Sequence, residues 1–196
     1  GHPVDLDALQ AVCDRYNIAL VEDAAESLGS TYKGQHTGSI GACASLSFNG
    51  NKTITTGGGG AVLTNNEELA DRAKHLTTTA KRDHAWEYFH DQLGYNYRMP
   101  NLNAALGCAQ LEQLPGFLEK KRRLANRYQT AFADVEGVSF VSEPSFARSN
   151  YWLNTILLDA AHGDQRDTVL KQTNDAGLMT RPTWTLMHRL PMYNDC

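Results

Sequence analysis

The chain has 196 residues, 41% of them hydrophobic, which is enough to bury the core of one domain and part of another. Its formal net charge of −4 argues against a nucleic-acid-binding surface and gives no reason to expect a membrane surface. No apolar run approaches the roughly 20 residues that span a bilayer, and we expect neither a signal peptide nor a membrane anchor. The cysteines lack the short spacings of disulfide frameworks or metal sites, so we expect reduced thiols and a cytoplasmic protein; they are Cys13, Cys43, Cys108 and Cys196.

The first part of the chain predicts a helix followed by strands. Asp5 is placed to cap a helix with apolar residues at helical spacing, and Asn17 ends it. The apolar run 18–21 predicts a strand that is covered on both faces. A turn at Lys33-Gly34 leads to a second strand pattern over 42–48. This helix-then-strand order indicates an α/β fold.

The middle of the chain is rich in glycine and aromatic residues. The run Gly57–Gly60 predicts close backbone approach or positive φ, and a short strand over 61–63 follows it. A short amphipathic helix is expected over 67–76. Residues 77–99 are irregular, polar and aromatic, and a loop of this length usually has a function. The alternative is a surface loop clamped by its own aromatic side chains.

Two helices separated by a break are predicted next. Asn101 is expected to cap the first helix, Pro115-Gly116 to end it, and a second helix to run over 117–133. The basic run 120–123 is read as a solvated helix face rather than a phosphate-binding patch. The residues expected on the buried sides are Leu102, Ala105, Leu106, Ala109 and Leu114 in the first helix, and Phe117, Leu124, Tyr128 and Phe132 in the second.

The Pro115-Gly116 break is also the predicted domain boundary. Residues 1–115 would form part of a large cofactor-binding domain, a mostly parallel sheet with flanking helices. Residues 116–196 would form a linking helix and part of a small α+β domain. The elements expected there are strands over 138–141 and 151–158 and a helix over 165–176 that stops at Gly177.

Three chemically useful side chains follow the predicted strands: Asp23, Ser47 and Lys52. In an open parallel sheet, ligands bind beyond the carboxyl ends of the strands, so we expect these side chains to meet there. Pyridoxal phosphate needs an amine for its aldehyde, an anion for its pyridine nitrogen and donors for its phosphate. The sequence therefore predicts a pyridoxal phosphate site. Taken one at a time, Asp23 could be an ordinary helix cap, and Ser47 and Lys52 could have no functional role.

Four motifs, Val21–Gly29, Ser47–Lys52, Thr55–Gly60 and Gly94–Met99, resemble the DegT-type sugar-nucleotide aminotransferases, which are fold-type I pyridoxal phosphate enzymes. The resemblance covers nearly the whole chain, and the stretch 77–114 is most similar to the branch that acts in legionaminic acid biosynthesis. Such enzymes are roughly twice as long, judged against domains of about 100–200 residues, so we expect an internal fragment. Many relatives carry Glu where this chain has Gly58, which leaves the role of the glycine run open.

The resemblance implies a role for each residue of the cofactor site. Lys52 would form the Schiff base with pyridoxal phosphate and shuttle protons as general base and acid. Asp23 would anchor the pyridine nitrogen, and Ala25 would pack beneath the ring. Glu26 would lie near the ring hydroxyl, and Ser47 would donate to the phosphate.

The resemblance also implies partners. The protein would be a homodimer in which Asn96 reaches the phosphate of the partner subunit's cofactor, while the segment 77–99 forms subunit interface and substrate rim. Arg181 and His188 would contact the substrate. Glutamate would give the amine, and a nucleotide-linked 4-keto-6-deoxy sugar would receive it. Nucleic acids and membranes are not expected partners.

Two other functions fit the same sequence pattern. A sugar dehydratase on this scaffold replaces the Schiff-base lysine with histidine, so Lys52 argues against it. A cofactor-binding regulator or an inactive partner chain is the non-enzymatic alternative. Because relatives supply part of the phosphate cradle and a stacking ring from upstream of Gly1, we expect residues 1–196 alone to bind pyridoxal phosphate weakly and to be inactive.

Overall fold

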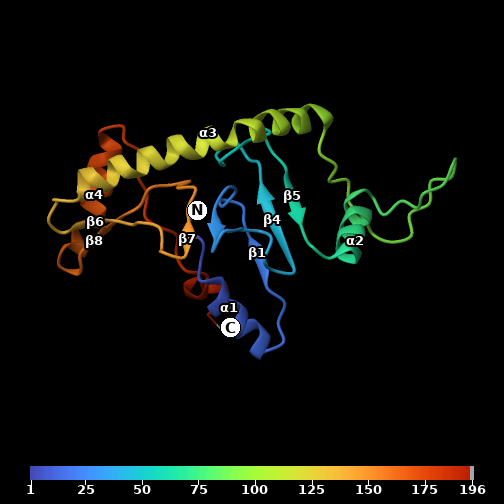
Figure 1. Ribbon diagram of the computed structural model, residues 1–196, viewed down its shortest axis with the longest axis horizontal. Helices are drawn as coiled ribbons and strands as arrows, with labels where there is room; N and C mark the ends of the chain where they lie inside the picture. Colours follow the sequence, from blue (N-terminus) through green and yellow to red (C-terminus); the bar gives the residue numbers. More distant parts are fainter. Residues whose placement is uncertain (195–196) are drawn as a thin grey trace.

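The computed structural model describes residues 1–194, which form the mixed α/β fold predicted from the sequence. A long helix, α3, runs along one edge of the molecule, with the strands beneath it (Figure 1). The elements in chain order are α1 (Leu6–Arg15), β1 (Val21–Asp23), β2 (Thr31–Tyr32), β3 (Gln35–His36), β4 (Cys43–Ser47), β5 (Gly60–Leu63), α2 (Glu67–Thr77), α3 (Asn101–Phe132), β6 (Val138–Phe140), β7 (Ala147–Arg148), β8 (Ile156–Leu158), η1 (Ala160–Gln165), α4 (Arg166–Asp175), η2 (Met187–Arg189) and η3 (Pro191–Tyr193).

The sheet β1-β4-β5 positions the two segments that contain Glu26, after β1, and Lys52, after β4. Strands β1 and β4 are parallel, with Val21 opposite Cys43, and β5 is antiparallel to β4, with Ser47 opposite Gly60. The carboxyl ends of β1 and β4 both point toward α3 (Figure 1). The segments that follow these two strands therefore meet at one edge of the sheet, as the sequence predicts.

The first strand begins later than predicted. Asp5 caps α1 as expected, its Oδ1 accepting from the Ala8 N–H at 3.2 Å. After Asn17, which has φ +52°, the Ile18 N–H returns to the carbonyl of Cys13 at 2.9 Å. Because this bond ties residue 18 to the helix end, β1 starts at Val21 and not at residue 18.

The expectation that β1 is covered on both faces is wrong for the described residues. Val21 in β1 is 62% exposed and Val62 in β5 is 58% exposed. The hydrophobic pattern of a strand identifies apolar side chains that favour burial. It does not show whether residues 1–194 contain the elements that pack against both faces of the strand.

A second sheet, β3-β2-β7, joins distant parts of the chain. Strands β2 and β3 form the predicted turn at Lys33-Gly34, where both residues have positive φ, +47° and +84°. Strand β7, from the second half of the chain, pairs with the other side of β2. Beneath this sheet a small core contains Leu6, Leu20 and Tyr32.

Helix α3 runs without a break through Pro115 and Gly116, so the predicted helix end there is wrong. Contacts on both sides of Pro115 hold the helix to the rest of the protein. On one side Gln110 Oε1 accepts from the Thr55 N–H at 3.3 Å, and on the other Arg122 binds Glu143. These contacts compensate for the hydrogen bond that proline cannot donate. The division into residues 1–115 and 116–196 remains a proposal, and it has no helix break to mark it.

Two further expectations for α3 are corrected. Asn101 is the first helical residue, while the extended Pro100 occupies the N-cap position without a side-chain cap bond. The apolar stripe is not buried among the described residues, since Leu102 is 87% exposed and Leu106, Leu124 and Tyr128 are also exposed. Helical spacing shows which side chains share a face and not what covers that face.

The basic run 120–123 is only partly solvated. Lys121 donates from Nζ to the carbonyl of Trp152 at 3.1 Å, and burial lowers the pKa of this amine. Arg122 is half-buried against Glu143, whereas Arg123 pairs with the exposed Glu119. The prediction of a solvated face holds for Arg123 and fails for Lys121 and Arg122.

The second half of the chain contains the expected α+β elements, with one strand shortened. Strands β6 and β8 pair antiparallel, and α4 ends before Gly177, which has φ +78°. The strand predicted over 151–158 is reduced to β8, because Tyr151 has φ +46°, a conformation that extended strand backbone does not adopt.

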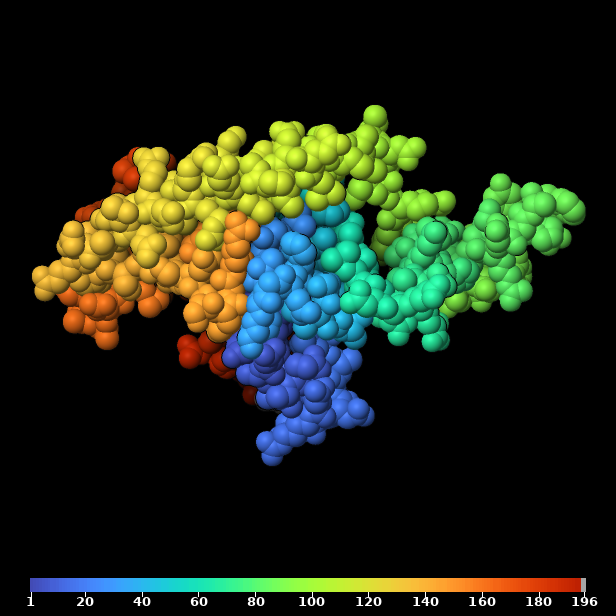
Figure 2. Space-filling view, in the orientation of Figure 1, coloured from blue at the N-terminus to red at the C-terminus, as the bar shows by residue number. Residues whose placement is uncertain are grey.

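The segment 77–99 is irregular, as predicted, and its two sides are joined by isolated β-bridges at Thr78 with Asn96 and at Lys81 with His90. Its tip, green in Figure 2, projects from the body of the molecule. Among residues 1–194 no helix is both long and apolar enough to cross a membrane. The free thiols are those of Cys13, Cys43 and Cys108; Cys196 lies outside the described residues.

Candidate active site

Lys52 lies in the turn that follows β4, and its Nζ forms an ion pair with the carboxylate of Glu26, in the loop that follows β1. The Lys52 side chain is 13% exposed and that of Glu26 is 32% exposed. The family resemblance implies that both residues lie near one cofactor, and the structure brings them into direct contact. An amine and a carboxylate in contact at the end of two parallel strands can hold and exchange a proton.

Asp23 is the last residue of β1, three positions before Glu26. Its Oδ1 accepts from the Ala25 backbone N–H at 3.2 Å and from the Ser45 hydroxyl at 3.4 Å. These bonds orient the carboxylate, which remains exposed in the described residues. Asp23 and Lys52 make no direct contact with each other among the described residues, where Lys52 pairs with Glu26 instead.

Ser47 ends β4, and its hydroxyl accepts from the Asn49 N–H at 3.4 Å. The chain then turns, with the Lys52 N–H donating to the carbonyl of Asn49 at 3.1 Å. Ser47, Asp23 and Lys52 thus follow from the ends of two adjacent strands, as the sequence predicts. The hydroxyl hydrogen of Ser47 is left to donate to an acceptor outside the turn.

Two tryptophans that the sequence did not single out connect Lys52 to Arg181. Lys52 Nζ lies 5.0 Å from the ring centre of Trp152, and Trp152 stacks on Trp184 with ring centres 6.2 Å apart. The guanidinium of Arg181 lies 4.9 Å from the ring centre of Trp184. A predicted substrate residue is therefore linked to the predicted catalytic lysine through two stacked rings. The sequence predicts Trp152 within a strand, and a strand gives no indication that this ring reaches Lys52.

Asn96 and His188 lie apart from this cluster. Asn96 Oδ1 accepts from Arg98 Nε at 3.3 Å within the segment 77–99. His188 belongs to η2 and is exposed. Neither side chain contacts Lys52 or Glu26 among the described residues, so their predicted roles stay predictions.

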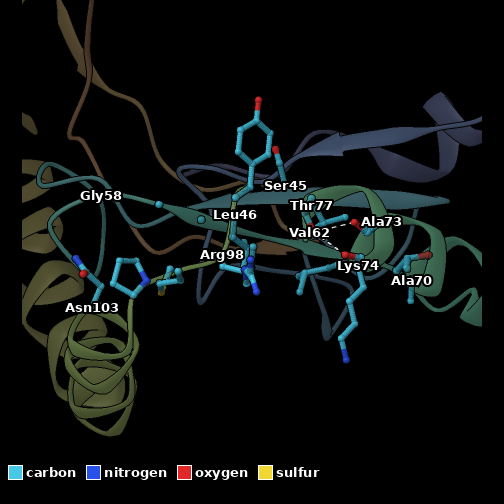
Figure 3. Close-up of a pocket in the computed structure, with 18 residues that line it drawn as sticks. Ser45, Leu46, Gly58, Val62, Ala70, Ala73, Lys74, Thr77, Arg98 and Asn103 are labelled. Carbon is cyan, nitrogen blue, oxygen red and sulfur yellow. Dashed lines mark hydrogen bonds between the residues drawn. The ribbon is translucent and has the colours of Figure 1, made fainter. Parts of the chain in front are cut away.

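A cavity of about 890 Å³ opens elsewhere, between β5, α2 and residues 97–103 (Figure 3). Asn103 and Gly58 stand at one end of it and Ala70 at the other. Its lining contains none of the predicted site residues. This cavity is therefore separate from the Lys52 cluster.

Glu22, for which the sequence predicts no separate role, is a buried carboxylate with a structural role. Its two oxygens accept backbone N–H groups from Gly38 at 2.6 Å, Ile40 at 2.8 Å and Gly41 at 2.7 Å. Three such bonds compensate for its burial and fix the loop that leads into β4. Glu22 and Asp23 are adjacent in one acidic motif, and nothing in the sequence distinguishes the structural role of Glu22 from the predicted cofactor-binding role of Asp23.

The groups gathered at this edge fit pyridoxal phosphate by their chemistry. The set offers an amine on Lys52, a fixed carboxylate on Asp23 and a hydroxyl donor on Ser47, the kinds of group that its aldehyde, ring nitrogen and phosphate require.

Comparison with known proteins identifies the family. All residues of the chain, 1–196, match the family model described as the DegT/DnrJ/EryC1/StrS aminotransferase family. The chain belongs to this family. The family and the fold class predicted from the sequence are thereby confirmed, whereas the legionaminic acid branch stays a prediction.

Individual members of the family resemble the chain over its full length. GDP-perosamine synthase of Escherichia coli O157:H7 is 39% identical over 195 residues, which cover 100% of this chain and 52% of the relative. The Erythromycin biosynthesis sensory transduction protein EryC1 of Saccharopolyspora erythraea is 34% identical, with 100% and 52% covered. The crystal structure of the aminotransferase TlmJ from Streptoalloteichus hindustanus superimposes with a TM-score of 0.90 at 29% identity, covering 98% of this chain and 52% of TlmJ. The chain thus spans about half the length of these relatives.

Proposed function

We propose that the whole protein is a pyridoxal phosphate-dependent aminotransferase that transfers an amine to a nucleotide-linked sugar. The observation that carries this proposal is the Lys52–Glu26 ion pair, held beside Asp23 at the carboxyl edge of two parallel strands. The family supports it, since relatives are named as an aminotransferase and as a GDP-perosamine synthase.

Bound pyridoxal phosphate supplies an electron sink for reactions at the carbon that bears an amino group. Lys52 would attach to its aldehyde, Asp23 would face its ring nitrogen, and Ser47 would donate to its phosphate. Ala25 would lie beneath the ring. The carboxylate of Glu26 holds the Lys52 Nζ in place, where the amine can accept a proton and return it.

The finer assignments rest on the sequence resemblance. We propose a 4-keto-6-deoxy sugar as the acceptor, glutamate as the donor, a homodimer in the cytoplasm as the working form, and Asn96 at the partner subunit's cofactor. The isolated residues 1–196 are expected to bind the cofactor weakly and to be inactive. An exposed Asp23 at the edge of an uncovered sheet supports this expectation.

The test uses the full-length protein with added pyridoxal phosphate. We expect a visible chromophore that borohydride reduces, with the reduced adduct on the peptide that contains Lys52. Lys52→Ala should remove both the chromophore and the adduct. Lys33→Ala is the matched control, because Lys33 is an exposed lysine paired with Asp7 on the surface. An unchanged chromophore in Lys52→Ala would exclude the proposed role.

A regulatory protein is the second candidate, because one relative is named a sensory transduction protein. A steady-state assay of amine transfer to a panel of nucleotide-linked keto sugars separates the two. Turnover that depends on Lys52 supports the enzyme, and cofactor binding without turnover supports the regulator. The dehydratase alternative is disfavoured because the chain has a lysine at position 52.

A further inference from the structure

The two residues that flank Lys52 are both hydrogen-bonded to one segment about a hundred positions later in the chain. Trp152 Nε1 donates to the carbonyl of Asn51 at 2.7 Å, and Asn150 Nδ2 donates to the hydroxyl of Thr53 at 3.2 Å. The backbone on each side of Lys52 is therefore held by residues of the second half of the chain. We name Ser149–Trp152 the clamp segment.

Asn150 also holds the loop that carries the ion-pair partner of Lys52. Its side-chain amide donates to the carbonyl of Glu26 at 2.8 Å and to that of Leu28 at 3.0 Å. Asn150 is fully buried, with 0% exposure, and its Oδ1 accepts from the Trp152 N–H at 2.9 Å. A buried amide with its donors and acceptor all used cannot be exchanged for another group without leaving partners unsatisfied.

Tyr151, which lies between Asn150 and Trp152, has an unusual backbone conformation. Tyr151 has φ +46°, in the left-handed region that bulky side chains rarely adopt. It is buried at 6% exposure and packs edge to face on His2, with ring centres 5.2 Å apart. This conformation lets Asn150 and Trp152 reach the Lys52 turn together. Strained, buried backbone of this kind is concentrated at functional sites.

We propose that Asn150 and Trp152 are positioning residues for Lys52. They act through Asn51, Thr53 and the backbone of Glu26, and the Trp152 ring covers the Lys52 amine from 5.0 Å. The proposal rests on the proposed function of Lys52, since a reactive amine must be held close to its productive geometry. It makes the placement of that amine depend on the second half of the chain.

The first test measures the reactivity of Lys52 in the full-length protein without cofactor. Sulfosuccinimidyl acetate modifies exposed amines, and peptide mass spectrometry gives the rate at Lys52. In Trp152→Phe, which keeps a ring but loses the bond to Asn51, we expect acetylation about three- to tenfold faster, as the loss of one hydrogen bond implies. Asn150→Asp, which loses both amide donors, should give an increase at least as large.

Ser149→Ala is the matched control. Ser149 is about as buried as Asn150, but among residues 1–194 its hydroxyl accepts only from the N–H of Tyr151, at 3.0 Å, and makes no bond to the Lys52 turn. Its Lys52 acetylation rate should stay within about twofold of the wild type, a change smaller than one lost hydrogen bond would give. If Asn150→Asp does not fold, Trp152→Phe decides. Wild-type rates in a folded Trp152→Phe variant, or equal increases in Ser149→Ala, would overturn the proposal.

The second test uses the same variants with cofactor and substrates. The clamp predicts a shifted pH titration of the lysine-bound chromophore and a kcat about tenfold lower, with the KM for the sugar nucleotide unchanged within about threefold. Loss of folding alone would lower the active fraction without moving the titration. If the wild type forms no chromophore on Lys52, the proposed function fails, while the acetylation rates still decide whether the clamp positions this side chain.

Discussion

Arg122 on α3 donates two parallel hydrogen bonds to Glu143, from Nη1 to Oε2 at 2.8 Å and from Nη2 to Oε1 at 2.7 Å. Both partners also hold Ser149. Arg122 donates to its carbonyl at 2.8 Å, and Glu143 accepts from its N–H at 2.6 Å. Because Ser149 opens the clamp segment, the ion pair links the long helix to the turn that carries Lys52. The pair is a bidentate one, the geometry in which arginine binds carboxylates best.

Glu143→Gln should lower the free energy of unfolding by about 1–3 kcal/mol, since it leaves a half-buried guanidinium without its counter-charge. Urea denaturation of the full-length protein measures this. Glu119→Gln is the control, because the Glu119–Arg123 pair is exposed at 68% and 62%. Its effect should stay below about 0.5 kcal/mol. Equal losses of unfolding free energy in the two variants would show that the Arg122–Glu143 pair stabilises the protein no more than the exposed Arg123–Glu119 pair.

The same pair predicts how stability changes with pH. The Arg122 hydrogen bonds, followed by the Ser149 N–H, hold the pKa of Glu143 below its ordinary value of 4.5. A carboxylate with a lowered folded-state pKa contributes stability above pH 4.5, and the contribution is lost as pH falls through the folded-state pKa. The difference in unfolding free energy between wild type and Glu143→Gln should therefore be largest near neutral pH and shrink below pH 4.5. A difference that stays constant down to acid pH would contradict the linkage.

Sequence reasoning succeeded where the cause of the structure is local. The cap at Asp5, the turn at Lys33-Gly34 and the positive φ of Gly57 and Gly59 depend on neighbours within a few residues. It failed where distant contacts decide. Helix α3 continues through Pro115 because contacts on both sides anchor it, and no signal near the proline reports them.

The candidate site divides in the same way. The placement of Asp23, Ser47 and Lys52 after the ends of two adjacent strands could be predicted, because the rule for parallel strands needs only the strand ends. The roles of Asn150 and Trp152 could not, because their bonds to the Lys52 turn join residues 97 and 101 positions apart. The sequence even predicts a strand over 151–158, which includes Trp152, and the left-handed backbone of Tyr151 shows why that strand does not begin there.

Gly116→Ala should stabilise the protein by about 0.5–1 kcal/mol, because alanine loses less backbone freedom in a helix than glycine does. A Cβ at Gly116 would meet nothing within 4 Å, even though Pro115 precedes it. Gly107→Ala on the same helix is the matched comparison. There the Cβ would lie 3.0 Å from Thr56 Cγ2, so the gain should be absent or reversed. Thermal unfolding of both variants checks this, and a gain from Gly107→Ala as large as from Gly116→Ala would count against the packing argument.

Gly58→Glu should leave stability unchanged within about 0.5 kcal/mol. Gly58 lacks positive φ, and a Cβ there would meet nothing within 4 Å. Gly59→Ala should instead cost about 1–2 kcal/mol, because the left-handed region is unfavourable for a residue with a Cβ. Gly59 has φ +88°, and its Cβ would lie 2.9 Å from Met99 Cε. Urea denaturation of the two variants compares adjacent positions, and similar losses at both would refute the distinction.

Arg181→Met should raise the KM for the sugar nucleotide about tenfold or more, because the proposed substrate carries a diphosphate that a guanidinium binds strongly. The guanidinium lies 4.9 Å from the ring centre of Trp184, at the outer end of the stack that leads to Lys52. The half-reaction with the amino donor does not involve the nucleotide, so its rate, followed by the absorbance of the bound cofactor, should not change. Arg189→Met, an exposed arginine in η2, is the control and should leave both measurements unchanged. If Arg181→Met slows the donor half-reaction as much as the acceptor half-reaction, Arg181 supports the cofactor site and does not select the nucleotide.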